Sequence, residues 1–392
     1  IEIAAIADLD LKTDRGVRID RKILTTDGFS VCSNSEIDIV VELVGGTGIA
    51  AKFIEAALQN GKHVITANKA LLSEKGEKLF QLAEKKGKLL LFEAAVGGAI
   101  PIIRTIKTSF ASERIEKIYG ILNGTCNFIL TKLADEGGDF ERVLKEAQQK
   151  GFAEADPTLD ISGGDTAHKI ALLASLAFGA RVDFKKIHVE GITKLAPADF
   201  EFARRLNRVI KLVAVAKKEG REIEIRVHPT LLLKNSPLAK IDGVTNAVSI
   251  HGKNLGEIIL SGPGAGSLPT ATAVVGDIIE AARNSKISIR GISQKDLQKF
   301  PIKKITEIES EYYLRFGVRD QPGVIRDISG VLAKHKLNVR DILQLDLQEF
   351  KKEVPLAMIL HKNSELKIRK AVEEIDRLKC TREKTIVLRV EE

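Results

Sequence analysis

The sequence predicts an α/β fold in three parts: a parallel sheet interleaved with helices, a mixed α/β middle part, and a C-terminal βαββαβ unit. Two observations predict this fold. In the first part, short apolar runs alternate with stretches of helical spacing, which is typical of buried parallel sheets. In the last part, strand-like and helix-like patterns follow each other in the order βαββαβ. With 392 residues, the chain is long enough for two or three domains.

The apolar runs of the first part predict four buried strands with helices between them. The strands are expected at residues 1–7, 37–43, 63–66 and 88–92, and the helices at 50–58 and 73–86. In parallel sheets, ligands bind beyond the carboxyl ends of the strands. The residues at those ends are Asp8, Gly45, Gly46, Asn68, Lys69 and Glu93. We therefore expect a ligand site among them.

A dinucleotide-binding, Rossmann-like sheet normally begins with a strand and a GxGxxG turn, and the sequence shows no such turn at its start. If residues 1–7 are the second strand of such a sheet, Asp8 is the acid that holds the adenosine ribose. Two interpretations remain open: the first strand is absent from this chain, or no dinucleotide binds. We expect the former, because the downstream pattern fits an interrupted Rossmann half. Asp8 favours NAD, whereas Lys12 and Arg15 could meet the phosphate of NADP.

The middle part is predicted to be α/β, and the end of the chain to be a separate ferredoxin-like unit. Middle helices are expected at 165–178 and 199–209, strands at 211–216 and 222–227, and a further helix from the SGPGAG turn (261–266) to 283. In the last unit, strands are expected at 312–318, 339–345, 354–361 and 386–390, with helices at 324–332 and 368–375. The expected domains are 1–103 with a returning helix near 270–284, 104–293, a linker over 294–310, and 311–392.

Composition excludes several classes of function. The net charge is +8, but the basic residues are scattered among acidic ones and form no block with interleaved aromatics, so we expect no nucleic-acid partner. No apolar run approaches the ~18 residues of a membrane span, and no signal peptide is visible. Cys32, Cys126 and Cys380 lie far apart, which favours reduced, buried thiols in a cytoplasmic protein. A lone catalytic thiol remains an alternative.

Three segments have residues suited to chemistry, and each has a plainer interpretation. In GFAEADPTLDISGGDTAHK (151–169), Asp165 and Lys169 share a helix face beside further acids; the plainer interpretation is a helix cap and a surface pair. In VITANKALL, Lys69 comes just after a strand end, inside the predicted cleft; the plainer interpretation is a surface lysine after a turn. In EAAVGGAIP, Glu93 and inward carbonyls could cage a hard cation, or the glycines simply make a tight turn.

Together, these strings resemble homoserine dehydrogenase. The matching strings are VVELVGG, VITANKALL, EAAVGGAIPII, NGTCNFIL, GFAEADPTLDISGGDTAHKIALLA and GPGAGSLPTATAVVGDI, and they cover nearly all of residues 1–293 in the family's order. The segment VRDQPGVIRDISGVLAKHKLNV resembles an ACT domain, which several members of the family carry.

The resemblance implies interconversion of L-homoserine and L-aspartate 4-semialdehyde with NADP or NAD. It assigns Lys169 and Lys69 to catalysis and Glu154, Asp165, Lys69 and Thr125 to the substrate. It assigns Lys69, Gly151, Glu154 and a glycine of GPGAG, Gly264 or Gly266, to the cofactor, in addition to Asp8 and Gly45 at the strand ends. It also implies a structural sodium ion held by Glu93 and the carbonyls of Val96, Gly98 and Ile100.

The ACT resemblance implies feedback by an amino acid such as threonine, bound near Asp320, Gly323 and Asn338, in a homodimer or homotetramer. A purely structural dimerisation module is the plainer interpretation of this unit. Two other functions remain open. One is a dehydrogenase of another amino-acid alcohol, and the other is a cofactor-free regulatory protein that senses an amino acid.

Overall fold

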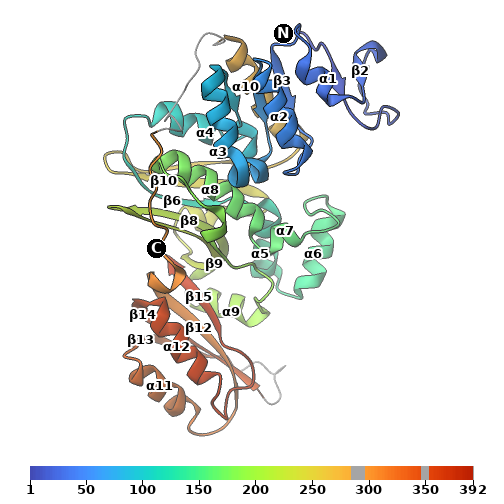
Figure 1. Cartoon of the computed structure of the whole chain (residues 1–392). Helices are drawn as coiled ribbons and strands as arrows, with labels where there is room; N and C mark the ends of the chain where they lie inside the picture. The colour runs from blue at the N-terminus through green and yellow to red at the C-terminus, as the bar shows by residue number, and fades with distance from the viewer. Residues whose placement is uncertain (284–295, 346–352, 392) are drawn as a thin grey trace.

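The structure, a computed structural model, describes residues 1–283, 296–345 and 353–391. Three parts follow one another in a row, with the N-terminal part at one end and the C-terminal unit at the other (Figure 1). The predicted domain boundary at 293/294 lies outside the described residues, as does residue 284 of the predicted returning helix.

The N-terminal part contains the predicted parallel sheet. Its strands are β3 (Ile39–Glu42), β4 (His63–Thr66) and β5 (Leu90–Leu91), in the order β3-β4-β5. Its helices are α2 (Ile49–Gln59), α3 (Lys69–Lys86) and α10 (Ser267–Arg283). Neighbouring residues of β4 face opposite sides: Val64 packs in the core that includes Ile54 of α2, and Ile65 packs with Val274 of α10. The predicted returning helix therefore covers the second face of this sheet.

The predicted buried strand over residues 1–7 is wrong in length and in burial. Only Ile6–Ala7 forms a strand, β1, and it pairs in parallel with β2 (Leu24–Thr25) in a separate sheet beside α1 (Gly28–Ser33). Ile1 is 87% exposed and Ile3 66% exposed. The apolar run does not become a core strand because, among the described strands, only the short β2 pairs with it.

The middle part is an antiparallel sheet covered by helices. Its strands are β6 (Ile115–Ile121), β8 (Arg208–Glu219), β9 (Glu222–Leu233), β10 (Thr245–Gly252) and β11 (Gly256–Pro263), in the order β11-β10-β6-β8-β9. Short strand β7 (His188–Val189) pairs with β9, and the helices are α5 (Gly124–Glu136), α6 (Phe140–Gln149), α7 (Thr158–Ile161), α8 (Gly164–Phe178) and α9 (Pro197–Arg205). Helix α8 packs across β6, β8 and β9.

One middle helix ends earlier than predicted. The expected helix over 199–209 stops at Arg205, and strand β8 begins at Arg208. Asn207 turns the chain between them with φ of 53°, in the left-handed region that asparagine tolerates better than most residues. The SGPGAG turn also differs from the prediction, since its first three residues complete β11.

The C-terminal unit has the predicted βαββαβ order. Its elements are β12 (Glu309–Arg319), α11 (Val324–Lys334), β13 (Val339–Gln344), β14 (Glu353–Ser364), α12 (Glu365–Ile375) and β15 (Ile386–Glu391). The strands lie in the order β15-β12-β14-β13.

The middle and C-terminal sheets are continuous, which the sequence did not predict. Strand β15 pairs in parallel with β9, with Arg389 opposite Thr230 and Glu391 opposite Leu232. The C terminus accordingly lies at the junction of the two parts (Figure 1). The described part of the predicted linker is docked, because Gln298 bridges to Ala180 and Ile302 bridges to Ile223. The C-terminal unit is therefore fixed to the middle part by backbone hydrogen bonds.

Two expectations from composition can be compared with the fold. Cys32, Cys126 and Cys380 are free and buried, as expected. Over residues 1–283, 296–345 and 353–391, none of the helices combines the length and the apolar character needed to cross a membrane.

Candidate active site

Two lysines and one aspartate meet between the N-terminal and middle parts. Asp165 lies in the first turn of α8, and Lys169 lies one turn later on the same face, as predicted. Lys169 Nζ lies 2.7 Å from Asp165 Oδ2 and donates to the Leu122 carbonyl at 2.6 Å. Lys69 is the first residue of α3, and its Nζ lies 3.1 Å from Asp165 Oδ1. The structure thus joins three residues that are far apart in the sequence.

The charge state of Asp165 follows from its neighbours. Asp165 and Lys169 are both buried, with exposed fractions of 4% and 8%. Burial alone would raise the pKa of the Asp165 carboxyl, but the ammonium groups of Lys169 and Lys69 hold that pKa well below its ordinary value. Asp165 is therefore a carboxylate at neutral pH, and the plainer interpretation of a surface pair is wrong, because the pair is buried.

Sequence analysis did not assign Asn123 and Asp160 to the site. The Asn123 amide donates to Asp160 Oδ1 at 2.7 Å and to Asp165 Oδ2 at 2.8 Å, so it links both acids. Its own carbonyl oxygen accepts from Cys126 N and caps α5. Burial raises the pKa of Asp160. The signals in the sequence were weak: Asn123 falls in the matching string NGTCNFIL, and Asp160 falls in the acid-rich segment 151–169.

The remaining predicted substrate residues lie at different distances from this cluster. The hydroxyl of Thr125, on α5, donates to the Phe152 carbonyl, and its oxygen lies 3.5 Å from Asp160 Oδ2. Glu154 is exposed, and in the described residues its carboxylate makes no hydrogen bond or ion pair. Gly151 turns the chain after α6 with φ of 72°, and a Cβ there would meet nothing within 4 Å. Thr125 therefore lies beside Asp160, whereas Glu154 is open to solvent.

The loop after β3 presents bare backbone at the carboxyl edge of the sheet. Buried Glu42 accepts the hydroxyl of Thr66 at 2.6 Å and the backbone N–H groups of Val44 and Gly45 at 2.8 and 3.0 Å. Gly45 and Gly46 have φ of 80° and 69°, and a Cβ on either would meet nothing within 4 Å.

The same edge also has apolar surface. Leu43 and Val44 expose 62% and 59% of their surfaces. Asn68 Nδ2 donates to the Gly46 carbonyl at 2.7 Å and so ties the loop to the start of α3 and to Lys69. Accessible backbone and apolar surface beside a parallel sheet fit a nucleotide.

Asp8 lies directly after β1, as predicted, but its carboxylate already has a partner. Arg15 Nη2 lies 2.9 Å from Asp8 Oδ2, and both side chains are more than two-fifths exposed. The candidate NAD-binding acid and the candidate NADP-binding base therefore form an ion pair with each other.

The two glycine-rich turns meet. A Cβ on Gly98 would lie 2.7 Å from the backbone of Gly264, and Ala99 N donates to the Pro263 carbonyl at 3.1 Å. A Cβ on Gly264 would collide with the amide of Asn246. Gly266 has φ of 118° and precedes α10. Gly264 is thus needed for packing, whereas a Cβ on Gly266 would meet only Pro269, at 3.4 Å.

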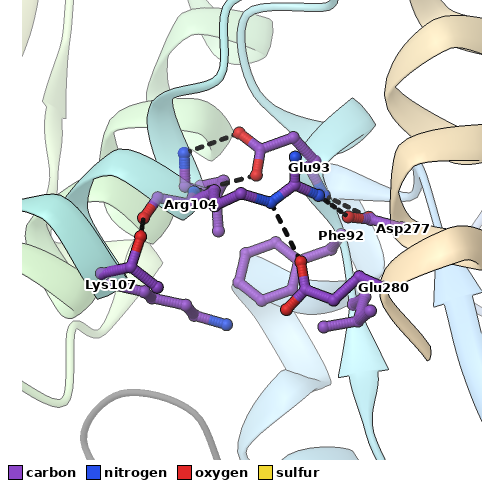
Figure 2. A pocket seen from close by; sticks show the side chains of 9 residues that line it. Phe92, Glu93, Arg104, Lys107, Asp277 and Glu280 are labelled. Carbon is purple, nitrogen blue, oxygen red and sulfur yellow. Dashed lines mark hydrogen bonds and ion pairs between the residues drawn. The ribbon is translucent and has the colours of Figure 1, made fainter. Parts of the chain in front are cut away.

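Glu93 has a role that the sequence did not predict. Its two carboxylate oxygens accept the backbone N–H groups of Ile103 and Arg104, each at 2.9 Å, at the start of α4 (Ile102–Arg104). Its own N–H donates to Asp277 of α10 at 2.9 Å. Burial raises the pKa of Glu93 to about 7 and that of Asp277 to about 6. These residues line a pocket with Lys107 and Glu280 (Figure 2).

The predicted sodium ligands can be tested against these contacts. The Ile100 carbonyl accepts Ile102 N at 2.7 Å, and Gly97 and Gly98 both have positive φ. Each Glu93 oxygen accepts one N–H and keeps a lone pair. In the described part of the chain, no group of three or more His, Cys, Asp or Glu side chains could hold a metal, so a cation here would depend on carbonyl oxygens. The sodium site stays a prediction.

The predicted effector residues do not meet within one chain. Asp320 follows the end of β12, where Arg319 pairs with Glu353. Asn338 precedes β13, beside His361, at the opposite end of the same strands. Gly323 precedes α11 with φ of 94°. A single effector site that used both Asp320 and Asn338 would therefore need two copies of the chain.

His168 links the two helices that carry Lys69 and Lys169. Its Nδ1 lies 2.6 Å from Ser73 Oγ on α3, and its ring stacks on Phe184. Burial lowers the pKa of His168. The side chain therefore joins α8 to α3 one turn after Lys69.

Comparison with known proteins identifies the family of this chain. Three family models match. The model of the homoserine dehydrogenase NAD-binding domain matches residues 1–93, the homoserine dehydrogenase model matches residues 101–279, and the ACT domain model matches residues 312–380. A homoserine dehydrogenase of Neisseria gonorrhoeae is 40% identical over all of this chain and 91% of its own length.

Solved structures give the same result. The homoserine dehydrogenase of Thiobacillus denitrificans has a TM-score of 0.89 and 39% identity over 94% of this chain and 85% of its own. A hyperthermophilic archaeal homoserine dehydrogenase in complex with NADPH has a TM-score of 0.58 and 29% identity over 67% of this chain and 76% of its own. This chain belongs to the homoserine dehydrogenase family, with an NAD-binding domain, a catalytic domain and an ACT domain.

Proposed function

We propose that this chain interconverts L-homoserine and L-aspartate 4-semialdehyde, with Lys169 as the acid and base. The contacts of the Lys169 ammonium support this proposal most directly. An ammonium has three N–H donors, and Asp165 and the Leu122 carbonyl account for two. Among the described residues no acceptor takes the third N–H, which we propose meets the oxygen of the substrate.

In the reductive direction, a bound reduced nicotinamide would supply a hydride to the aldehyde carbon. Negative charge then grows on the carbonyl oxygen, and the ammonium of Lys169, held in place beforehand, stabilises it. Lys169 Nζ gives that oxygen a proton, the product alcohol forms, and the amine regains a proton from solvent. In the oxidative direction the Lys169 ammonium first loses a proton to solvent, and the neutral amine then takes the hydroxyl proton as the substrate carbon gives up its hydride. Asp165 and Leu122 keep the nitrogen in place in both directions.

The α-amino group of homoserine is protonated, and carboxylates are suited to bind it. Asp165 and Glu154 are the two acids that we assign to this ammonium, with Lys69 and Thr125 as further contacts. The exposed position of Glu154 supports this role, because its carboxylate is available to a ligand. An alcohol without the α-amino group would lose these charge-assisted bonds, which contribute roughly 1.5–3 kcal/mol each.

The cofactor is NADP or NAD, held at the carboxyl edge of the N-terminal sheet. The residues proposed to hold it are Asp8, Gly45, Lys69, Gly151, Glu154 and Gly266. Open space over Gly45 supports this assignment. The archaeal relative in complex with NADPH favours NADP, for which Arg15 would exchange Asp8 for a phosphate. Replacing Arg15 by Ala should then raise the KM for NADP more than the KM for NAD.

A sodium ion at the loop after β5 is a further part of the proposal. Glu93 and the carbonyls of Val96, Gly98 and Ile100 would hold it, and the ion would supply a fixed positive charge where two glycines turn the chain. Thermal unfolding in NaCl against choline chloride at equal ionic strength tests this. A higher Tm in sodium supports the site, and equal Tm values contradict it.

The ACT domain is proposed to bind threonine as a feedback inhibitor near Asp320, Gly323 and Asn338, in a cytoplasmic homodimer or homotetramer. The distance between Asp320 and Asn338 along β12 supports an interface between two copies. Light scattering with and without threonine measures the assembly, and inhibition kinetics measure the feedback. Unchanged activity and mass at saturating threonine would exclude this effector.

The experiment for the activity follows absorbance of the reduced nucleotide with homoserine and either NADP⁺ or NAD⁺. We expect homoserine-dependent reduction. As a control, 1,4-butanediol has the same reacting alcohol without the amino or carboxyl group, and we expect it to be turned over far more slowly. Equal turnover of both would contradict the assignment of Asp165 and Glu154 to the amino group.

A further inference from the structure

Two buried arginines hold the ACT domain against the catalytic domain. Arg389 of β15 is 1% exposed and pairs with Glu365 at the start of α12 and with Glu190, which follows β7. Arg226 of β9, also 1% exposed, pairs with Glu391 of β15. Replacing buried ion pairs by apolar side chains often leaves stability unchanged. The fixed geometry of these pairs therefore matters more to our inference than their contribution to stability.

Glu190 belongs to the catalytic domain and lies between Arg389 and the turn that joins α7 to α8. Its backbone N–H donates to the Val227 carbonyl of β9 at 2.8 Å. Its carboxylate lies 2.7 Å from His188 Nε2 and contacts Arg389 on the other side. The side chain of Glu190 is thus held by its own strand and by the ACT domain.

The residue after Glu190 packs on the turn between α7 and α8 with no spare room. A Cβ on Gly191 would lie 2.2 Å from the Ile161 carbonyl oxygen and 2.7 Å from Ser162 Cα. Ile192 N donates to that same Ile161 carbonyl at 2.9 Å. Interiors packed this closely transmit small displacements, because no void absorbs them.

The α7–α8 turn carries both acids of the site. Asp160 lies in α7 before the turn, Asp165 lies in the first turn of α8 after it, and Asn123 links the two. Asp165 in turn fixes Lys169 and Lys69. A path of direct contacts therefore leads from Arg389 of the ACT domain to the proposed acid and base.

We infer that Glu190 is a positioning residue of the reaction: Arg389 holds it, and it holds the turn that places Asp165 and Lys169. The catalytic centre then depends on how the ACT domain is docked. This inference rests on the proposed function for its kinetic test, and a second readout is independent of activity.

The test compares Glu190→Gln, Arg389→Lys and their double variant in the full chain. Asp199→Asn is the matched control. Asp199 is a buried carboxylate at the same domain boundary, bound by Arg315 Nε at 2.7 Å and by the Tyr313 hydroxyl, but it lies on α9. Arg389→Lys keeps the charge, so a folded variant is available if Glu190→Gln fails to fold.

We expect Glu190→Gln and Arg389→Lys to lower kcat and raise the KM for homoserine, by roughly 2- to 30-fold in kcat/KM, the range for residues that couple two sites. The KM for the nucleotide should not change. The double variant should be no worse than the worse single variant, because both break one link. A partly unfolded population would lower kcat and leave both KM values unchanged.

Amide hydrogen exchange gives the second readout. Residues 158–166 should exchange faster in Glu190→Gln and Arg389→Lys than in Asp199→Asn. Unchanged exchange there, with kinetics equal to those of the control, would overturn the inference even though the parent chain turns over homoserine. If the parent chain is inactive, the proposed function fails, and the exchange rates alone decide the inference.

Discussion

Replacement of Lys169 by alanine tests the proposed chemistry most sharply. The change removes the ammonium that contacts Asp165 at 2.7 Å and the Leu122 carbonyl at 2.6 Å. A positioned general acid contributes roughly 10²- to 10⁴-fold to a rate. We therefore expect kcat to fall by about that factor, which corresponds to about 3–5 kcal/mol of transition-state stabilisation.

The same change should leave the protein folded. A buried charge left without a partner costs about 3–5 kcal/mol. Asp165 keeps Lys69 at 3.1 Å and Asn123 at 2.8 Å, so the cost should be smaller, roughly 1–3 kcal/mol. Thermal unfolding by circular dichroism measures this loss, and nucleotide reduction with homoserine measures kcat.

Lys132→Ala is the matched control for this experiment. Lys132 also pairs with a carboxylate one helical turn away, Glu136 at 2.6 Å, but this pair is on the surface of α5. We expect wild-type turnover and little change in thermal stability, because exposed ion pairs are screened by solvent. A Lys169→Ala variant that is folded and turns over within a few-fold of the parent would refute the role of Lys169.

Three further predictions concern charge, backbone and thiol. Asp165→Asn should lower kcat/KM for homoserine by at least tenfold. Because the pKa of Asp165 is depressed in the folded protein, its carboxylate stabilises the parent above pH ~4, and this contribution is lost as the pH falls. The free energy of unfolding in urea should therefore depend less on pH in the variant than in the parent between about pH 4 and pH 2. Gly98→Ala should lower the Tm by several degrees, because its Cβ would meet the Gly264 backbone at 2.7 Å. Gly45→Ala has open space for its Cβ and should cost only about 1 kcal/mol of backbone strain, so equal losses of stability in the two variants would contradict the packing of the two turns. Burial raises the pKa of the Cys126 thiol well above its usual value, so iodoacetamide should leave Cys126 unmodified in the folded protein, and rapid alkylation detected by mass spectrometry would reopen the alternative of a catalytic thiol.

Local periodicity predicted those elements whose faces are set by nearby residues. Helix α8 and the βαββαβ unit are examples, because apolar spacing determines which side of each is buried. The strand over residues 1–7 failed for the opposite reason: its apolar residues need a neighbour, and sequence pattern does not report pairing. Pairing between β9 and β15 was invisible for the same reason.

In the candidate site, too, some contacts could be predicted from sequence spacing and others could not. Asp165 and Lys169 could be paired from their i, i+4 spacing. Family resemblance assigned Lys69 to the same site, and its contact with Asp165 is seen only in the fold. Asn123 and the Leu122 carbonyl join the site through tertiary packing, and a backbone carbonyl has no sequence signature. The position of Glu190 beside Arg389 likewise depends on how two sheets join.

The most direct test of the central claim is the initial rate of NADP⁺ or NAD⁺ reduction by the purified chain as homoserine is varied. The account predicts saturable, homoserine-dependent reduction that disappears in Lys169→Ala and persists in Lys132→Ala. Saturable reduction that Lys169→Ala retains would contradict the assignment of the acid and base. No reduction with either nucleotide would contradict the proposed activity of this chain and favour an amino-acid-sensing role.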